Sequence, residues 1–146
     1  MSLLTASRTA QSPLVAEFSF GHDDTMVNDA GATVDFGLTN TTETTFVIIP
    51  LPPGSTVTGG SLNVTEAFDA ATYAVTIGDT ADEDEYLGTA DRKGVATTPL
   101  VPTGLVNTNG LNIVINITCA DVCTTGQAKV VVEYVVENRS CEVQIA

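Results

Sequence analysis

The residues best suited to chemistry are the carboxylates of one short acidic stretch, DTADEDE, at positions 79–85. Calcium takes about six to eight oxygen ligands, and clustered carboxylates supply them. An EF-hand loop beginning at Asp79 would need glycine at its sixth position and glutamate at its twelfth, where this chain has Asp84 and Ala90. The favoured interpretation is a solvated loop that repels itself. Asp79, Asp82 and Asp84 are therefore only weak candidates for metal ligands, and we expect no cofactor.

Other catalytic arrangements have little support in this sequence. His22, the only histidine, precedes Asp23 and Asp24, an order that would suit a base and its orienting group. Turn-forming residues surround it, however, so a loop histidine is the favoured interpretation. The chain has no G-x-S-x-G motif, no phosphate-binding loop and no tryptophan to stack against a sugar ring. No carboxylate pair lies at a defined spacing on predicted strands. We expect that the protein is not an enzyme.

The three cysteines are Cys119, Cys123 and Cys141. Cys119 and Cys123 could bridge a turn, and the sequence leaves open whether they do. An odd number of cysteines, together with residues 1–12 that lack the pattern of a secretion signal, favours reduced thiols. No C-x-x-C pair is present, so we expect no metal site at these residues.

The elements that would position these groups are β-strands. Apolar residues alternate with polar ones in several short segments separated by turn residues. The pattern predicts about eight strands, over 14–20, 34–38, 45–49, 55–65, 73–77, 111–117 and 129–136, with short ones at 97–102 and 143–145. No segment suits a helix long enough for a parallel crossover, so the strands should pair antiparallel. We predict an all-β fold, an antiparallel jelly-roll-like β-sandwich. Residues 1–12 would form an extended N-terminal arm, and residues 13–146 a single domain.

One predicted strand changes its buried face midway. Before Gly59 and Gly60 the apolar position is odd, at Val57, and after them the apolar positions are even, at Leu62 and Val64. Side chains alternate across a strand with period two, so a phase change requires an inserted residue. Because glycine tolerates positive φ, we predict a β-bulge at this glycine pair.

The net charge of −13 limits the classes of partner. Nucleic-acid binding depends on basic patches that neutralise phosphates, and the five basic residues here are scattered. An anionic membrane surface would also repel the chain, and no apolar run is long enough to span a membrane. We expect neither a nucleic acid nor a membrane as partner. The acidity could serve solubility alone, the favoured interpretation, or docking onto a basic partner surface.

Three segments resemble a recurrent sequence type in the head modules of tailed phages. They are LPPGSTVTGGSLNVTEAFDAATYAVTIGD at 51–79, EYLGTADRK at 85–93 and GQAKVVVEYVVENR at 126–139. In those phage proteins a G-G-x-L-x-V-T-E-A-F strand leads to a G-D turn and a Y-L step. A closing strand G-x-A-K/R-V-V-V-E-Y follows and ends close to an arginine. The turn between Cys119 and Cys123 departs from that pattern.

The resemblance implies a phage virion structural protein, a capsid cement or decoration protein. Such proteins sit on the capsid exterior, bridge neighbouring capsomers and form symmetric oligomers. Made in the host cytoplasm, the chain would then bind the major capsid protein and its own copies, as a homotrimer or a dimer. The expected partner-binding residues are in the arm and in the last short strand: Leu3, Leu4, Arg8, Val143 and Ile145.

A second hypothesis is a calcium-dependent β-sandwich that binds a ligand or receptor, as a head fibre or tail component would. A calcium titration followed by thermal melting separates the two hypotheses. A large rise in Tm favours the calcium-dependent binder, and no rise favours the cement protein.

Overall fold

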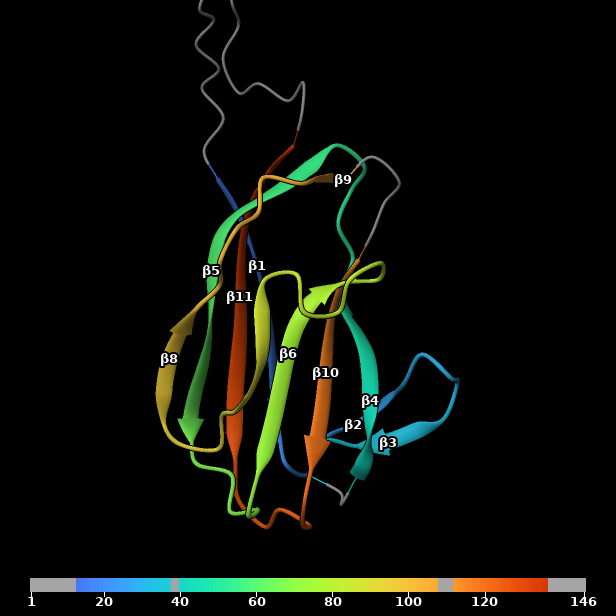
Figure 1. Cartoon of the computed structure of the whole chain (residues 1–146), viewed down its shortest axis with the longest axis vertical. Helices are drawn as coiled ribbons and strands as arrows, with labels where there is room; N and C mark the ends of the chain where they lie inside the picture. The colour runs from blue at the N-terminus through green and yellow to red at the C-terminus, as the bar shows by residue number, and fades with distance from the viewer. Residues whose placement is uncertain (1–12, 38–39, 108–111, 137–146) are drawn as a thin grey trace, which may run out of the picture.

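The computed structural model describes residues 13–37, 40–107 and 112–136, which form eleven strands (Figure 1). No helix occurs in these ranges, and hence none that could cross a membrane. The strands are β1 (Leu14–Gly21), β2 (Thr25–Val27), β3 (Thr33–Asp35), β4 (Asn40–Ile49), β5 (Ser55–Glu66), β6 (Tyr73–Asp79), β7 (Leu87–Asp91), β8 (Ala96–Pro99), β9 (Val106–Asn107), β10 (Ile113–Cys119) and β11 (Gln127–Val136).

The strands pair antiparallel in two main sheets and one hairpin. The first sheet has the order β1-β11-β5-β8, with β9 also pairing with β5. The second has the order β4-β10-β6-β7, and β2 pairs with β3 alone. In Figure 1 the second sheet lies beside the first, and the β2-β3 hairpin projects from the β4 edge. The prediction of an all-β antiparallel fold is confirmed.

The predicted number of about eight strands is wrong, because the structure has eleven. The additional strands are short or lack alternation. Strand β2 has three residues and β9 has two, and neither is among the predicted segments. Strand β3, which also has three residues, overlaps the strand predicted over 34–38. In β7 only Leu87 is buried, so its sequence carries no period-two signal and pairing with β6 alone makes it a strand. The predicted strand at 143–145 lies outside the described residues.

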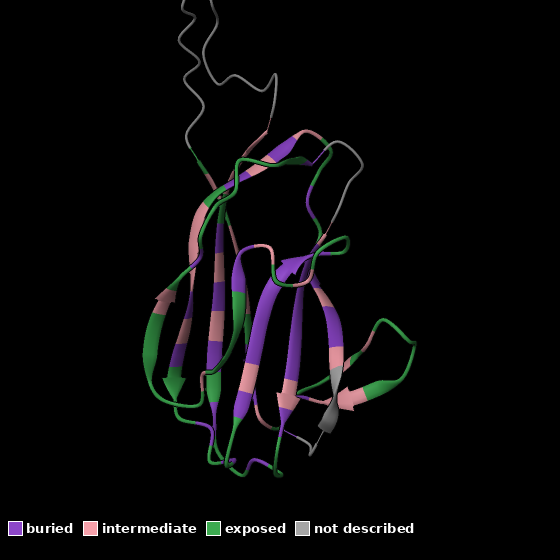
Figure 2. Ribbon diagram, in the orientation of Figure 1, coloured by how far each residue is buried: buried purple, intermediate pink, exposed green. Residues whose placement is uncertain are grey.

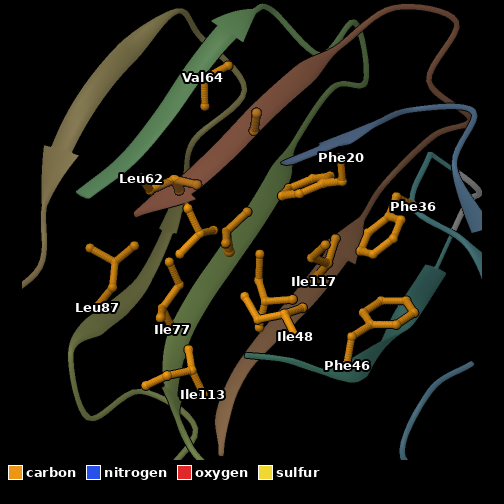
Figure 3. Packing of buried hydrophobic residues seen from close by; sticks show 14 of the residues in the cluster. Phe20, Phe36, Phe46, Ile48, Leu62, Val64, Ile77, Leu87, Ile113 and Ile117 are labelled. Carbon is orange, nitrogen blue, oxygen red and sulfur yellow. The ribbon is translucent and has the colours of Figure 1, made fainter. Parts of the chain in front are cut away.

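A single hydrophobic cluster receives side chains from both main sheets. Figure 2 shows the buried residues concentrated along the central strands of each sheet, and Figure 3 shows side chains of both sheets pointing toward one another. The alternation read from the sequence gives the correct inward residues of β10, because Ile113, Ile115 and Ile117 are buried in the cluster. Val130 and Val132 of β11 are buried there too, although that segment is apolar at odd and even positions alike.

The five phenylalanines of the chain all belong to one aromatic array inside this cluster. Phe18, Phe20, Phe36 and Phe46 contact one another in series, and Phe68 contacts both Phe20 and Tyr73. The Tyr73 ring stacks on Phe68 with centroids 3.9 Å apart, and its hydroxyl donates to the Phe36 carbonyl at 2.8 Å. Burial raises the pKa of Tyr73 well above its ordinary value. The array connects strands of both sheets.

The bulge predicted in β5 is present, one residue before the glycine pair. Glu133 of β11 pairs with Gly59 and Tyr134 pairs with Val57, so Thr58 is the extra residue. Gly60 has a φ of 139°, and a Cβ there would lie 2.1 Å from the Val131 carbonyl oxygen. The bulge therefore changes the buried face of the strand, and glycine at position 60 permits the close approach of β11.

The thiols of Cys119 and Cys123 are both free and buried, with sulfur atoms 3.5 Å apart. Burial, reinforced by the hydrogen bond between the two thiols, raises the pKa of Cys123 to about 12. Cys141 lies outside the described residues.

These thiols should be unreactive in the native protein. Both thiols are buried, and the raised pKa keeps the Cys123 thiol protonated at neutral pH, so iodoacetamide should modify them only after unfolding, which peptide mass spectrometry would detect. The free energy of unfolding should fall as pH rises from about 9 to about 12, because the Cys123 thiol ionises in the unfolded chain first. Rapid alkylation of Cys119 or Cys123 in the folded protein at neutral pH would contradict the buried placement.

Candidate functional site

The acidic stretch folds back onto the second sheet. Figure 1 shows the chain after β6 looping across the ends of β6 and β10 before it returns as β7. Asp79 is only 3% exposed, and its Oδ1 accepts hydrogen bonds from the backbone N–H groups of Ala81 and Asp82, each at 2.8 Å. Asp79 therefore shapes the turn that begins the loop.

The loop is in part solvated, as predicted, and in part anchored, which the prediction did not include. Asp82 and Asp84 are exposed, whereas Glu83 is half-buried. The Glu83 carboxylate accepts hydrogen bonds from Thr45 Oγ1 at 3.0 Å and from Asn116 Nδ2 at 2.7 Å. Glu83 therefore attaches the loop to strands β4 and β10.

The groups that hold Glu83 form a polar row across three strands. Asn116 of β10 pairs directly with Thr45 of β4 and with Thr76 of β6. The neighbouring Ile115 and Ile117 point into the hydrophobic cluster, so this row lies on the opposite face of the sheet. Asn116 Nδ2 also donates to Thr45 Oγ1 at 3.2 Å. The row provides a polar floor beneath the acidic loop.

A glycine lets the loop approach this face closely. A Cβ at Gly78 would lie 2.1 Å from the Asp82 carbonyl oxygen and 2.5 Å from the Glu83 carbonyl carbon. Both are backbone atoms, which cannot rotate away as the end of a side chain can. Any larger residue at position 78 must therefore displace the loop.

Gly78→Ala is expected to loosen the acidic loop and destabilise the fold by about 1–3 kcal/mol, because the new methyl group overlaps the loop backbone. Hydrogen exchange should speed up at the N–H of Asp82, which donates to Asp79. Gly88→Ala is the control, since a Cβ at Gly88 meets nothing within 4 Å. Equal exchange rates in both variants would contradict the conclusion that the loop needs the absence of a side chain at position 78.

A hollow of about 280 Å³ lies between the loop and the polar floor. It is lined by Thr76, Ala81, Asp82, Glu83, Asp84, Thr89 and Asn116. A hydrogen-bonding contact with the carboxyl group of Asp84, and a second one with Glu85, lower the pKa of Asp82 below its ordinary value. In the described part of the chain, no group of three or more His, Cys, Asp or Glu side chains could hold a metal ion.

The structure describes only some of the predicted site residues, and those it describes lie in or beside the hollow. Leu3, Leu4, Arg8, Val143 and Ile145 lie outside the described residues. Asp82 and Asp84 line the hollow, and Asp79 shapes the adjacent turn. Sequence reasoning missed the roles of Glu83 and Thr76. The available signal was Asn116, a polar residue within the otherwise apolar segment 113–117.

His22 contacts the backbone at Gly126 and has a structural role. It is half-buried, its backbone N–H donates to the Gly126 carbonyl at 2.9 Å, and its Nδ1 lies 3.4 Å from the same oxygen. Asp24 accepts a hydrogen bond from the Gly21 N–H at 2.6 Å. These bonds stabilise the turn after β1.

The arrangement of the strands can be compared with solved structures. This chain shares its fold with chains of two phage capsid structures. One is the cyanophage Pam1 capsid asymmetric unit, with a TM-score of 0.57, 21% identity, and coverage of 91% of this chain and 92% of that one. The other is the acid-stable capsid of Helicobacter pylori bacteriophage KHP30, with a TM-score of 0.62, 17% identity, and coverage of 93% and 96%. No protein-family model and no curated protein sequence matches the chain.

Both matches extend over more than nine-tenths of each chain, so the likeness concerns the whole fold and not a local motif. It agrees with the resemblance to phage head proteins in the segments 51–79, 85–93 and 126–139.

Proposed function

We propose that this protein is a phage virion structural protein that binds the outside of the capsid and cements neighbouring capsomers. The observation that carries the proposal is the shared fold with chains of two phage capsids over more than nine-tenths of their length. In this proposal the two sheets act as a rigid jelly-roll-like sandwich with no catalytic role. The net charge of −13 keeps free copies apart and disfavours binding to packaged DNA.

The proposed contacts use the ends of the chain and the sheet edges. Residues 1–12, with Leu3, Leu4 and Arg8, would order on a neighbouring subunit, and Val143 with Ile145 would pair with a partner's sheet edge. Strand β1 is an edge of the first sheet, and its Val15 is 56% exposed. An edge strand offers unpaired backbone groups to another chain. We propose a homotrimer, with a dimer as the alternative.

The test adds purified protein to heads assembled without it and images them by electron microscopy. We expect density at regular positions on the outer surface and greater resistance of the heads to heat. A ligand present at about 100 times its Kd stabilises the form that it binds by about 2.7 kcal/mol. Heads that remain bare at saturating protein would refute the proposal.

Two further measurements test the proposed role of residues 1–12 and the proposed oligomeric state. Deletion of residues 2–12 should reduce occupancy and heat resistance, and unchanged values would refute the role of the arm. Size-exclusion chromatography with light scattering should give the mass of a trimer or a dimer, and a monomer would contradict the proposed self-association.

A further inference from the structure

Thr76, which lines the hollow, has a buried hydroxyl group without a hydrogen-bond partner. Only 7% of the residue is exposed. Because Thr76 pairs directly with Asn116 in the polar row and lines the hollow, its side chain points toward the acidic loop. A buried hydroxyl without a partner is costly, so this group is suited to a hydrogen bond from outside the chain.

Glu83, which lines the hollow, carries a charge that its hydrogen-bond donors do not neutralise. Glu83 receives its two hydrogen bonds from uncharged groups, Thr45 and Asn116. The ion pairs of Lys93 with Asp91 and of Lys129 with Glu17 do not involve Glu83. Each carboxylate oxygen can accept more than one hydrogen bond, so Glu83 can still accept from a cation.

The chemistry of the hollow favours one basic side chain. Calcium needs about six to eight oxygen ligands, and the described residues provide no group of three acidic, histidine or cysteine side chains that could hold a metal. Lysine and arginine donate three and five hydrogen bonds and accept none, which complements carboxylate and hydroxyl acceptors.

We propose that this hollow receives a lysine or arginine side chain from a neighbouring capsid subunit, with Glu83 and Thr76 as its principal hydrogen-bond acceptors. The inference rests on the proposed function and specifies how the chain would recognise the head. A different protein suits the hollow better than a second copy of this chain, which has only five basic residues against eighteen acidic ones. A cation beside the half-buried Glu83 would be screened by salt less than a pair on an open surface.

The first test measures binding of Glu83→Gln to heads that lack the protein. Glutamine keeps the shape and a hydrogen-bonding group and removes the charge. We expect about tenfold weaker binding or more, as for loss of one partner of an enclosed charge pair. Glu66→Gln is the matched control, because it makes the same charge change at an exposed position at the end of β5 and should alter Kd by less than about twofold.

The second test uses Thr76→Val, which replaces the hydroxyl by a methyl group of nearly the same shape. We expect weaker head binding together with an unchanged or higher Tm of the free protein, because the replaced hydroxyl has no partner in the chain. A purely structural role for Thr76 predicts a lower Tm and unchanged affinity. That result would overturn the inference.

The outcomes separate this inference from the function on which it rests. If the wild-type protein fails to bind heads, the proposed function is refuted and the inference with it. If wild type binds, and Glu83→Gln binds as tightly as wild type or no more weakly than Glu66→Gln, the inference alone is refuted. Circular dichroism shows that each variant is folded, and unchanged hydrogen exchange at the Asp82 N–H shows that the acidic loop of Glu83→Gln keeps its place, so weaker binding can be assigned to the hollow.

Discussion

Gly60→Ala is expected to lower the free energy of unfolding by about 3 kcal/mol or more. Gly60 lies in the bulged strand β5 and has a φ of 139°, a backbone angle that residues with a side chain rarely adopt. An added Cβ would lie 2.1 Å from the Val131 carbonyl oxygen, which belongs to the backbone of the paired strand β11. Relief of the overlap must separate the two strands, so the loss should appear as a lower urea midpoint and a lower Tm.

Gly59→Ala provides the matched control one residue away. A Cβ at Gly59 meets only the carboxylate end of Glu133, at 3.4 Å, and that flexible side chain can move. Gly59 is also not among the glycines with positive φ. We expect a change of about 1 kcal/mol or less. A similar loss of stability in both variants would contradict the role given to the backbone conformation of Gly60.

Phe20→Ala is expected to cost about 3–5 kcal/mol. Phe20 is 3% exposed and contacts three other rings, with centroids 4.8 Å from Phe36, 6.1 Å from Phe18 and 6.2 Å from Phe68. Truncation removes the ring that links Phe36 to Phe68 and leaves a cavity inside the array. Chemical unfolding of the purified protein measures the loss, and the slope against denaturant should stay unchanged if the fold is kept.

Val15→Ala in the same strand is the comparison for Phe20→Ala. Val15 is exposed, so its truncation should change stability by no more than about 0.5 kcal/mol. A loss for Phe20→Ala that is no larger than this value would contradict the packing of the aromatic array.

Several features of the fold could be predicted because they leave a local signal. Alternation at Ile113, Ile115 and Ile117 identifies the inward residues of β10, because a strand with one face in the core repeats every second residue. The change of parity between Val57 and Leu62 predicts the bulge for the same reason. The strands β2 and β9 are too short to carry such a signal and β7 lacks alternation, so the predicted number of strands was too small.

The candidate site could be predicted only in part. The acidic composition of residues 79–85 is evident in the sequence, and it predicts a solvated loop. That Glu83 contacts Thr45 and Asn116 depends on which strands are neighbours, and these residues are 38 and 33 positions away along the chain. The glycine at position 78 has no local signature of close packing, since its role comes from the loop backbone above it.

The sequence by itself thus determined the all-β antiparallel class, the acidic charge, the bulge and the inward faces of the main strands. These follow from composition and from short-range periodicity, which report whether each face of a segment is buried. Only the tertiary structure decided the order β4-β10-β6, the polar row across those strands and the contact of the acidic loop with it. Register between distant strands is set by contacts that form only when the whole chain packs. The hollow beside Glu83 and Thr76 therefore has no counterpart in any single segment of the sequence.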